Sequence, residues 1–321
     1  MTKIKVDVVA TSSVVPKVEL ERGLVKLSAL GFSFSLAENA LTQDFAYAGD
    51  PQQRAKAFYD AAMSDSELVW AIRGGYGAAM LLRHLAALDA NAATPKPKIL
   101  IGYSDLTALN QFVSERWGWK ILHAPMIASN DFHQMRIDDE AALMSFISGN
   151  VAKIRTKEAA LTWIHRVNSA LDNPIEARLN GGNLAVICSM IGTPWQLDFS
   201  GKIVFLEEIG ESWCKIERML QQLLLSGLLD KCKAVVLGEF SNCFDSSPRG
   251  LISDVDEARH NLRVVLTPEQ AMQRVFSDFG SALNVPVCAS VTVGHCAENS
   301  PLPLLANYRL CEENDLEFLS W

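Results

Sequence analysis

The sequence has few cysteines and no excess of positive charge, and each shortage argues against a class of protein. Its seven cysteines are scattered without CxxC spacing, which argues against both a disulfide framework and a structural zinc site. Acidic residues outnumber basic ones by 37 to 29, and no run of Lys and Arg is interleaved with aromatic residues. A nucleic-acid partner is therefore not expected.

Long apolar runs are also missing. No stretch approaches the roughly 20 apolar residues that span a bilayer. The first residues, MTKIKVDVVATSS, lack the apolar core and small-residue cleavage site of a signal peptide. Together with the unpaired cysteines, these features lead us to expect no membrane partner and a reducing, cytoplasmic location.

Cofactor and metal motifs are absent as well. The glycine-rich RGGYG at 73–77 does not match GxGxxG, and the chain has no GK[ST], HExxH or HxxxH. The sequence therefore predicts neither a dinucleotide cofactor nor a catalytic metal.

What the chain does contain is a pattern of short apolar strands alternating with amphipathic helices. At 321 residues it exceeds the usual size of one hydrophobic core, so two domains are expected. The alternation in residues 1–150 predicts an α/β domain with an open parallel sheet flanked by helices, flavodoxin-like or Rossmann-like. Residues 151–177 are interpreted as a crossover, and 178–321 as a second α/β domain rich in strands.

Ser104 lies where a buried strand turns into a helix, in the stretch KILIGYSDLTALNQFV. A serine before a helix is most often an N-cap. Gly102 would permit a tight turn, however, and amides at a helix N-terminus can stabilise an oxyanion. The nucleophile motif GxSxG would need glycine where Leu106 stands. From local chemistry alone, Ser104 is either a helix cap or a nucleophile.

Two further glycine-containing stretches lie at expected turns. RGGYG ends one strand, and is either a tight turn or a loop whose amides hold an oxyanion or a substrate carboxylate. Ligands of open α/β sheets bind at this carboxyl edge. Trp195, in IGTPW, could form a cleft wall or pack between domains.

An acid pair and one histidine complete the candidates. Glu207 and Glu208 follow the apolar KIVFL, and strand alternation sends their side chains to opposite faces, so only one can orient a histidine. Of the six histidines, His295 is expected at a strand end after a glycine, while the other five are expected in helical or irregular polar surroundings. A lone histidine is more often structural, but His295 has the placement of a general base.

These motifs, taken in order, resemble the serine LD-carboxypeptidases, a muropeptide-recycling family that includes the microcin C immunity peptidases. The resemblance runs from about residue 70 to the C-terminus, and the earlier TQDFAYAGDPQQRAKAF is similar to the family's FAG…RA segment. The matching blocks are RGGYG, GYSDLTAL, GGNLAVICSMIGTPW, FLEEIGE with IERMLQQLLLSGLL, VVLGEF, VTVGH and PLPLLAN.

The resemblance implies a Ser-His-Glu triad divided between two domains. Carried over by motif, Ser104 is the nucleophile on the N-terminal domain, and Glu207 and His295 are the acid and base on the C-terminal one. The family has Glu followed by Asp where this chain has Glu207 and Glu208, which leaves the choice of acid open. The implied oxyanion hole consists of the amide of Asp105 and one from the Gly74–Gly75 turn, with Gly75 as the donor.

The implied activity is hydrolysis of the LD-peptide bond of murein tetrapeptides with release of terminal D-alanine in cell-wall recycling, by a homodimer without a cofactor. The free carboxylate of such a substrate needs a cationic partner. Arg73 and Arg218 are the candidates, although either could instead form a structural ion pair.

Two alternatives are kept. A microcin C-type immunity peptidase would use the same triad on an aminoacyl-nucleotide or peptidyl-nucleotide amide, and would need an aromatic clamp for the base, for which Trp163, Trp195 and Trp213 are available. A non-catalytic small-ligand binding protein would give no special role to the triad residues.

Overall fold

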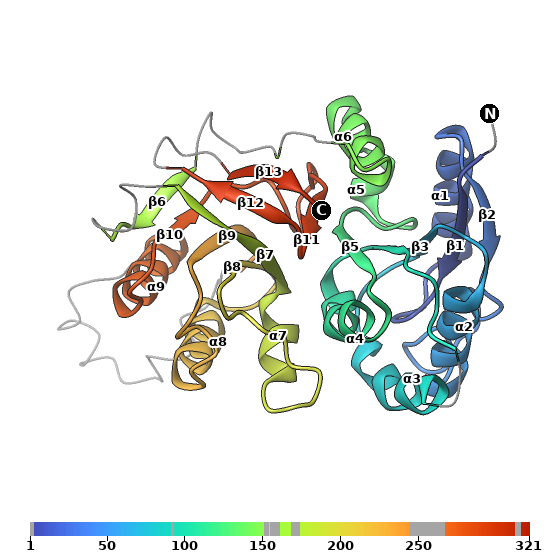
Figure 1. Cartoon of the computed structure of the whole chain (residues 1–321), viewed down its shortest axis with the longest axis horizontal. Helices are drawn as coiled ribbons and strands as arrows, with labels where there is room; N and C mark the ends of the chain where they lie inside the picture. Colours follow the sequence, from blue (N-terminus) through green and yellow to red (C-terminus); the bar gives the residue numbers. More distant parts are fainter. Residues whose placement is uncertain are drawn as a thin grey trace, which may run out of the picture.

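Two β-sheets covered by helices lie side by side in the computed structural model (Figure 1). The structure describes residues 3–90, 93–150, 154, 161–167, 174–243, 267–311 and 316–321. The predicted α/β class is confirmed, including the N-terminal parallel sheet flanked by helices. None of the helices in these ranges has the length and apolar character to cross a bilayer.

The N-terminal sheet has the strand order β11-β5-β4-β3-β1-β2. Its five strands from the first half of the chain are parallel, and helices α2, α3 and α4 cover one face while α1 and α5 cover the other (Figure 1). Burial on both faces explains why β3 is a continuous apolar run, LVWA, with every residue buried. The elements are β1 (Lys5–Val9), α1 (Lys17–Ala29), β2 (Ser33–Leu36), α2 (Pro51–Met63), β3 (Leu68–Ala71), η1 (Ala78–Leu81), α3 (Leu82–Asp89), β4 (Ile99–Ile101), η2 (Ser104–Leu106), α4 (Thr107–Trp117), β5 (Lys120–His123), α5 (Asn130–His133) and α6 (Ile137–Ile147).

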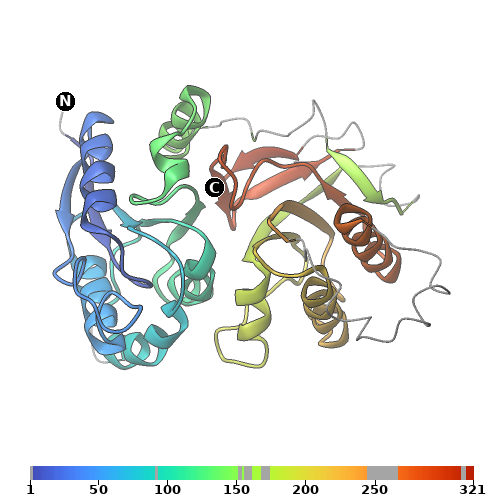
Figure 2. The same ribbon diagram turned by 180° about the vertical axis from the view of Figure 1, so that it is seen from behind.

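The C-terminal sheet is mixed and has the order β13-β12-β7-β8-β9-β10-β6. Its four central strands are parallel, and antiparallel strands close both edges. Helices α7, α8 and α9 gather on one side of this sheet (Figure 2). The elements are β6 (Thr162–His165), β7 (Ile175–Asn183), α7 (Leu184–Met190), β8 (Ile203–Ile209), α8 (Trp213–Leu225), β9 (Ala234–Ser241), α9 (Pro268–Ala282), β10 (Val287–Ala289), β12 (Asn307–Leu310) and β13 (Leu316–Ser320).

One strand from the second half of the chain joins the first sheet. β11 (Leu302–Leu304) pairs antiparallel with β5, with Leu302 opposite His123. The segment from β10 to β11 therefore runs from the C-terminal sheet to the N-terminal one. Much of the predicted crossover 151–177 lies outside the described residues, and the domain boundaries stay a prediction.

The loops at the carboxyl edge of the N-terminal sheet are tied together by a buried arginine. Arg54, in α2, is fully buried. Its guanidinium donates to the carbonyl oxygens of Thr11 at 2.6 Å, Gly49 at 3.0 Å and Gly77 at 2.9 Å. These carbonyls belong to the loops after β1, β2 and β3, so one side chain fixes three loops at the edge where ligands of open sheets bind.

We predict that Arg54→Met destabilises the fold strongly, because it removes the buried partner of three carbonyls and the positive charge near the Asp105 carboxylate. The free energy of unfolding in urea should fall by about 3–5 kcal/mol. Arg274→Met is the matched control, because it removes an exposed pair with Asp278 and should cost at most about 1 kcal/mol. Equal, small losses for both variants would contradict the role assigned to Arg54.

Candidate active site

Ser104 is the first residue of η2 and has a strained backbone just after β4. Its φ is +64°, in the left-handed region that non-glycine residues rarely adopt. The residue at the N-cap of η2 is Tyr103, and no side chain caps that helix. The helix-cap interpretation of Ser104 is therefore wrong, because its hydroxyl is directed elsewhere: Ser104 Oγ lies 2.9 Å from His295 Nε2.

The same histidine contacts a buried carboxylate on its other side. His295 Nδ1 lies 2.6 Å from Glu207 Oε2, and Glu207 is fully buried in β8. The carboxylate can only accept, so Nδ1 carries the shared proton and Nε2 is left to accept from the serine hydroxyl. Acid, imidazole and hydroxyl therefore form one continuous hydrogen-bonded relay.

The electrostatics of His295 are set by two opposing effects. Burial alone lowers the pKa of the imidazole, but the charge of Glu207 and its hydrogen bond outweigh burial, and the pKa of His295 lies above its ordinary value. Tyr103 packs edge-on against the imidazole, with the ring centroids 4.8 Å apart. The base is thus held in place by a carboxylate and by an aromatic ring.

Glu208 points to the opposite face of β8 and holds a different element. Its carboxylate accepts from Asn183 Nδ2, from the Ala185 amide and from the Ile209 amide, each at 2.8 Å. Burial raises the pKa of Glu208, although these hydrogen bonds oppose the shift. Glu208 therefore fixes the start of α7, and Glu207 contacts the imidazole.

His295 does not end a strand, as its sequence context suggested. β10 ends at Ala289, and His295 lies in the loop that leads to β11. The preceding Gly294 has a φ of +127°, and a Cβ atom there would lie 3.1 Å from Glu207 Oε2. Glycine thus lets the loop backbone approach the acid closely enough for the next residue to contact it.

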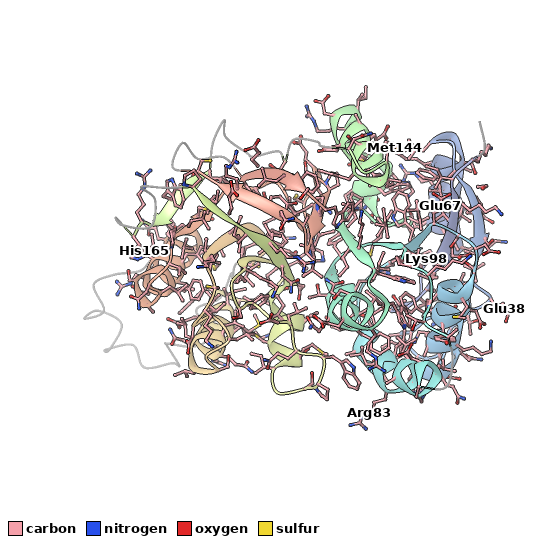
Figure 3. The ribbon with its side chains drawn as sticks, in the orientation of Figure 1. Glu38, Glu67, Arg83, Lys98, Met144 and His165 are labelled. Atoms are coloured by element: carbon pink, nitrogen blue, oxygen red, sulfur yellow. The ribbon has the colours of Figure 1, made fainter. Side chains whose placement is uncertain are left out.

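The surroundings of two other histidines were also predicted incorrectly. His123 ends β5 and is buried, and burial lowers its pKa to about 4. His165 ends β6 at the outer edge of the C-terminal sheet (Figure 3). Because the imidazole of His123 lies 5.1 Å from the Tyr103 ring, it belongs to the wall of the site as a neutral group.

Of the Gly74–Gly75 turn, Gly74 lies against the serine. A Cβ atom on Gly74 would lie 3.1 Å from Ser104 Oγ and 3.4 Å from the amide nitrogen of Asp105. Gly75 has a φ of +102°, and its nearest neighbour is Ser13. The Asp105 carboxylate accepts from the Ala78 amide at 2.8 Å, and burial raises its pKa. The oxyanion hole of Asp105 and Gly75 stays a prediction.

The remaining predicted residues are not gathered at the serine in the same way. Arg73, which directly precedes Gly74, is exposed, and its guanidinium donates to the Val14 carbonyl oxygen at 3.3 Å. Trp195 packs against the main hydrophobic core. Arg218 is exposed on α8 and lines a hollow with other residues of α8 and with Ile191, the residue after α7. None of the lining residues belongs to the relay.

Asp131 and Asn299 were not predicted, yet they lie beside the relay. Asn299 Nδ2 donates to Asp131 Oδ2 at 2.9 Å, and both residues are buried. They stand in short polar stretches, SNDFH and AENSP, where no motif separates them from ordinary loop residues. In the part of the chain that the structure describes, no cluster of His, Cys, Asp and Glu could hold a metal ion.

Comparison with known proteins yields matches over both halves. Residues 6–124 match the model of the LD-carboxypeptidase N-terminal domain, and residues 176–310 match that of the LD-carboxypeptidase C-terminal domain. A muramoyltetrapeptide carboxypeptidase from Oxalobacter formigenes of known crystal structure is 27% identical, with a TM-score of 0.74 over 97% of this chain and 96% of that one.

Two curated relatives are similar over most of their length. The murein tetrapeptide carboxypeptidase of Pseudomonas aeruginosa is 28% identical over 93% of this chain and 90% of that protein. A putative carboxypeptidase of Streptomyces coelicolor is 31% identical over 91% of this chain and 85% of that protein. On this likeness, and on the two domain models that match in sequence order, the chain belongs to the LD-carboxypeptidase family.

Proposed function

We propose that this chain is a serine carboxypeptidase that hydrolyses the LD-peptide bond of murein tetrapeptides and releases terminal D-alanine. The observation that carries the proposal is the relay of Glu207, His295 and Ser104, with contacts of 2.6 and 2.9 Å. A buried acid, an oriented imidazole and an accessible hydroxyl are the groups that acyl transfer through a serine requires.

The reaction follows from the order of these groups. His295 Nε2 takes the hydroxyl proton as Ser104 Oγ attacks the carbonyl carbon of the scissile bond. The amides of Asp105 and Gly75 donate to the oxyanion that forms. The nitrogen of the departing D-alanine takes the proton from His295, and water, activated by the same imidazole, then hydrolyses the acyl-enzyme.

Glu207 acts on the imidazole and not on the substrate. It holds the proton on Nδ1, so that Nε2 faces the serine, and it stabilises the imidazolium that forms during attack. The same stabilisation of the imidazolium raises the pKa of His295.

The substrate class is proposed from the family and from the surroundings of the serine. Relatives include a murein tetrapeptide carboxypeptidase, whose substrate would be cut here between the L-centre of diaminopimelate or lysine and D-alanine. Arg73 directly precedes Gly74, which lies against the serine, and this supports Arg73 over Arg218 as the partner of the terminal carboxylate.

The alternatives have less support. Trp163 and Trp195 pack against the main core and Trp213 against the second core, so no observation favours a clamp for a nucleotide base. A non-catalytic binding protein would not need the relay. A cytoplasmic location and a homodimer are retained as part of the proposal, and light scattering tests the second.

We predict that Ser104→Ala abolishes release of D-alanine from a disaccharide tetrapeptide, because the attacking oxygen is lost. Mass spectrometry of the released amino acid measures the effect, with Ser114→Ala as the control, because Ser114 is half-buried in α4 and donates only to its own helix. Undiminished turnover by Ser104→Ala would refute the nucleophile, and wild-type protein that releases no D-alanine would refute the substrate.

We predict that Glu207→Gln lowers kcat by orders of magnitude, whereas Glu208→Gln has a smaller effect, because only Glu207 contacts the imidazole. The base must be neutral, so activity rises with pH through the pKa of His295, and this limb should lie above the ordinary value of about 6.5. Without the charge of Glu207, burial dominates the pKa of His295, and the rise of activity with pH moves to lower pH. The pH profile of kcat/KM measures both effects, and a larger loss in Glu208→Gln would reverse the assignment.

A further inference from the structure

We propose that Asp131 is a positioning residue that aligns His295 with Ser104 by holding, through Asn299, the backbone that precedes His295 from the half of the molecule that carries Ser104. The inference rests on the proposed function, because it concerns the same serine and histidine. Asp131 lies in the short helix α5 of the N-terminal half and is 6% exposed. Asp131 takes no part in the two hydrogen bonds of the relay, so it acts on the relay through other residues.

The first connection leads to the base. Asp131 Oδ2 accepts from Asn299 Nδ2 at 2.9 Å, and Asn299 Oδ1 accepts from the Gly294 amide, also at 2.9 Å. An amide side chain donates through nitrogen and accepts through oxygen, so the carboxylate fixes the orientation of the Asn299 amide group. The backbone immediately before His295 is thereby held from the other half of the molecule.

The second connection leads to the nucleophile. Tyr103 interacts electrostatically with the Asp131 carboxylate. Burial, reinforced by this carboxylate, holds the pKa of Tyr103 well above its usual value, so the hydroxyl stays protonated. Tyr103 directly precedes Ser104, and its ring packs on the imidazole of His295.

A carboxylate of the N-terminal half therefore holds the backbone next to His295, whose imidazole meets a serine 191 residues away in sequence. Asn299 is 2% exposed and Asp131 is 6% exposed, so water does not readily replace the hydrogen bond between them. Displacement of a reacting group by about 1 Å can cost roughly 100-fold in rate. A connection that fixes the base in a 2.9 Å contact is therefore able to control that displacement.

The charged and titratable groups around the imidazole come from several elements of the described chain. They lie on β8, the Tyr103–Ser104 turn, β5, α5 and the loop of the base itself, and they are Glu207, Glu208, Tyr103, His123, Asp131 and Cys296. Asp131 is one of the carboxylates that raise the pKa of His295. Its neutralisation should therefore shift the titration of His295 to lower pH.

A reciprocal exchange tests the hydrogen bond between Asp131 and Asn299. Asp131 accepts from Asn299 on one oxygen and from the Phe132 amide on the other; Asp131→Asn leaves only one acceptor for these two donors, and Asn299→Asp places two carboxylates together. The double variant restores one donor and one acceptor with their direction reversed, while the carboxylate introduced at position 299 would still accept from the Gly294 amide. We expect each single variant to slow phosphonylation of Ser104 by a fluorophosphonate at least tenfold, and the double variant to recover most of the rate.

Asp139→Asn is the matched control. Asp139 is also buried in the N-terminal half and accepts from Ser300, in the same loop as His295 but five residues beyond it. It should leave the rate near that of wild type. Thermal melting of all variants separates loss of alignment from loss of fold.

The second readout does not need the serine to react. The Nδ1 proton of His295 and the titration of its ring are followed by NMR in the unliganded protein. The proposal predicts that Asp131→Asn weakens the downfield Nδ1 signal and lowers the pKa of His295, and that the exchange restores the signal. An unchanged signal and pKa in a folded Asp131→Asn variant would overturn the role of Asp131, whereas wild-type protein that resists the fluorophosphonate would overturn the nucleophile alone.

Discussion

The contact of 2.9 Å between Ser104 Oγ and His295 Nε2 is the constraint on which the rest of the structure depends, because its two partners are carried by different sheets. Ser104 follows β4 of the N-terminal sheet, and His295 lies in the loop that leaves β10 of the C-terminal sheet. That loop continues into β11, which pairs with β5. The segment that carries the base is therefore anchored at both ends, by β10 in the C-terminal sheet and by β11 in the N-terminal sheet.

The chemistry of the base depends on a balance between burial and charge. Burial pushes the imidazole towards its neutral form, and the carboxylate of Glu207 reverses that preference. His123 shows the outcome without a hydrogen-bonded acid, because burial lowers its pKa to about 4 although the charge of Glu207 opposes the shift. The same interior therefore holds one histidine as a neutral group and another as a base whose pKa is above the ordinary value. The hydrogen bond to Glu207 and the charges of the surrounding carboxylates account for the raised value.

The sequence allowed the β-α-β order and the family to be predicted, because both are written in local patterns and ordered motifs. It also named the three residues that form the relay. It could not place Asp131 or Asn299 at the site, because the two hydrogen-bonded residues lie 168 residues apart and their own surroundings are ordinary polar turns. Gly181, in LNGGN, shows a further constraint that local patterns do not reveal. It lies within β7, where a Cβ atom would lie 1.8 Å from the Phe205 carbonyl oxygen of the neighbouring strand, so the close approach of two strands requires glycine there.

The proposed mechanism requires Ser104 to form a covalent intermediate with the acyl part of the substrate. The most direct measurement is mass spectrometry of the peptide that contains Ser104, after the wild-type protein has been mixed with murein tetrapeptide and quenched in acid during the first turnover. We predict that this peptide carries an ester of the substrate from which D-alanine has been removed. Release of D-alanine with the adduct on a different residue, or with no adduct at any time in the first turnover, would contradict the account.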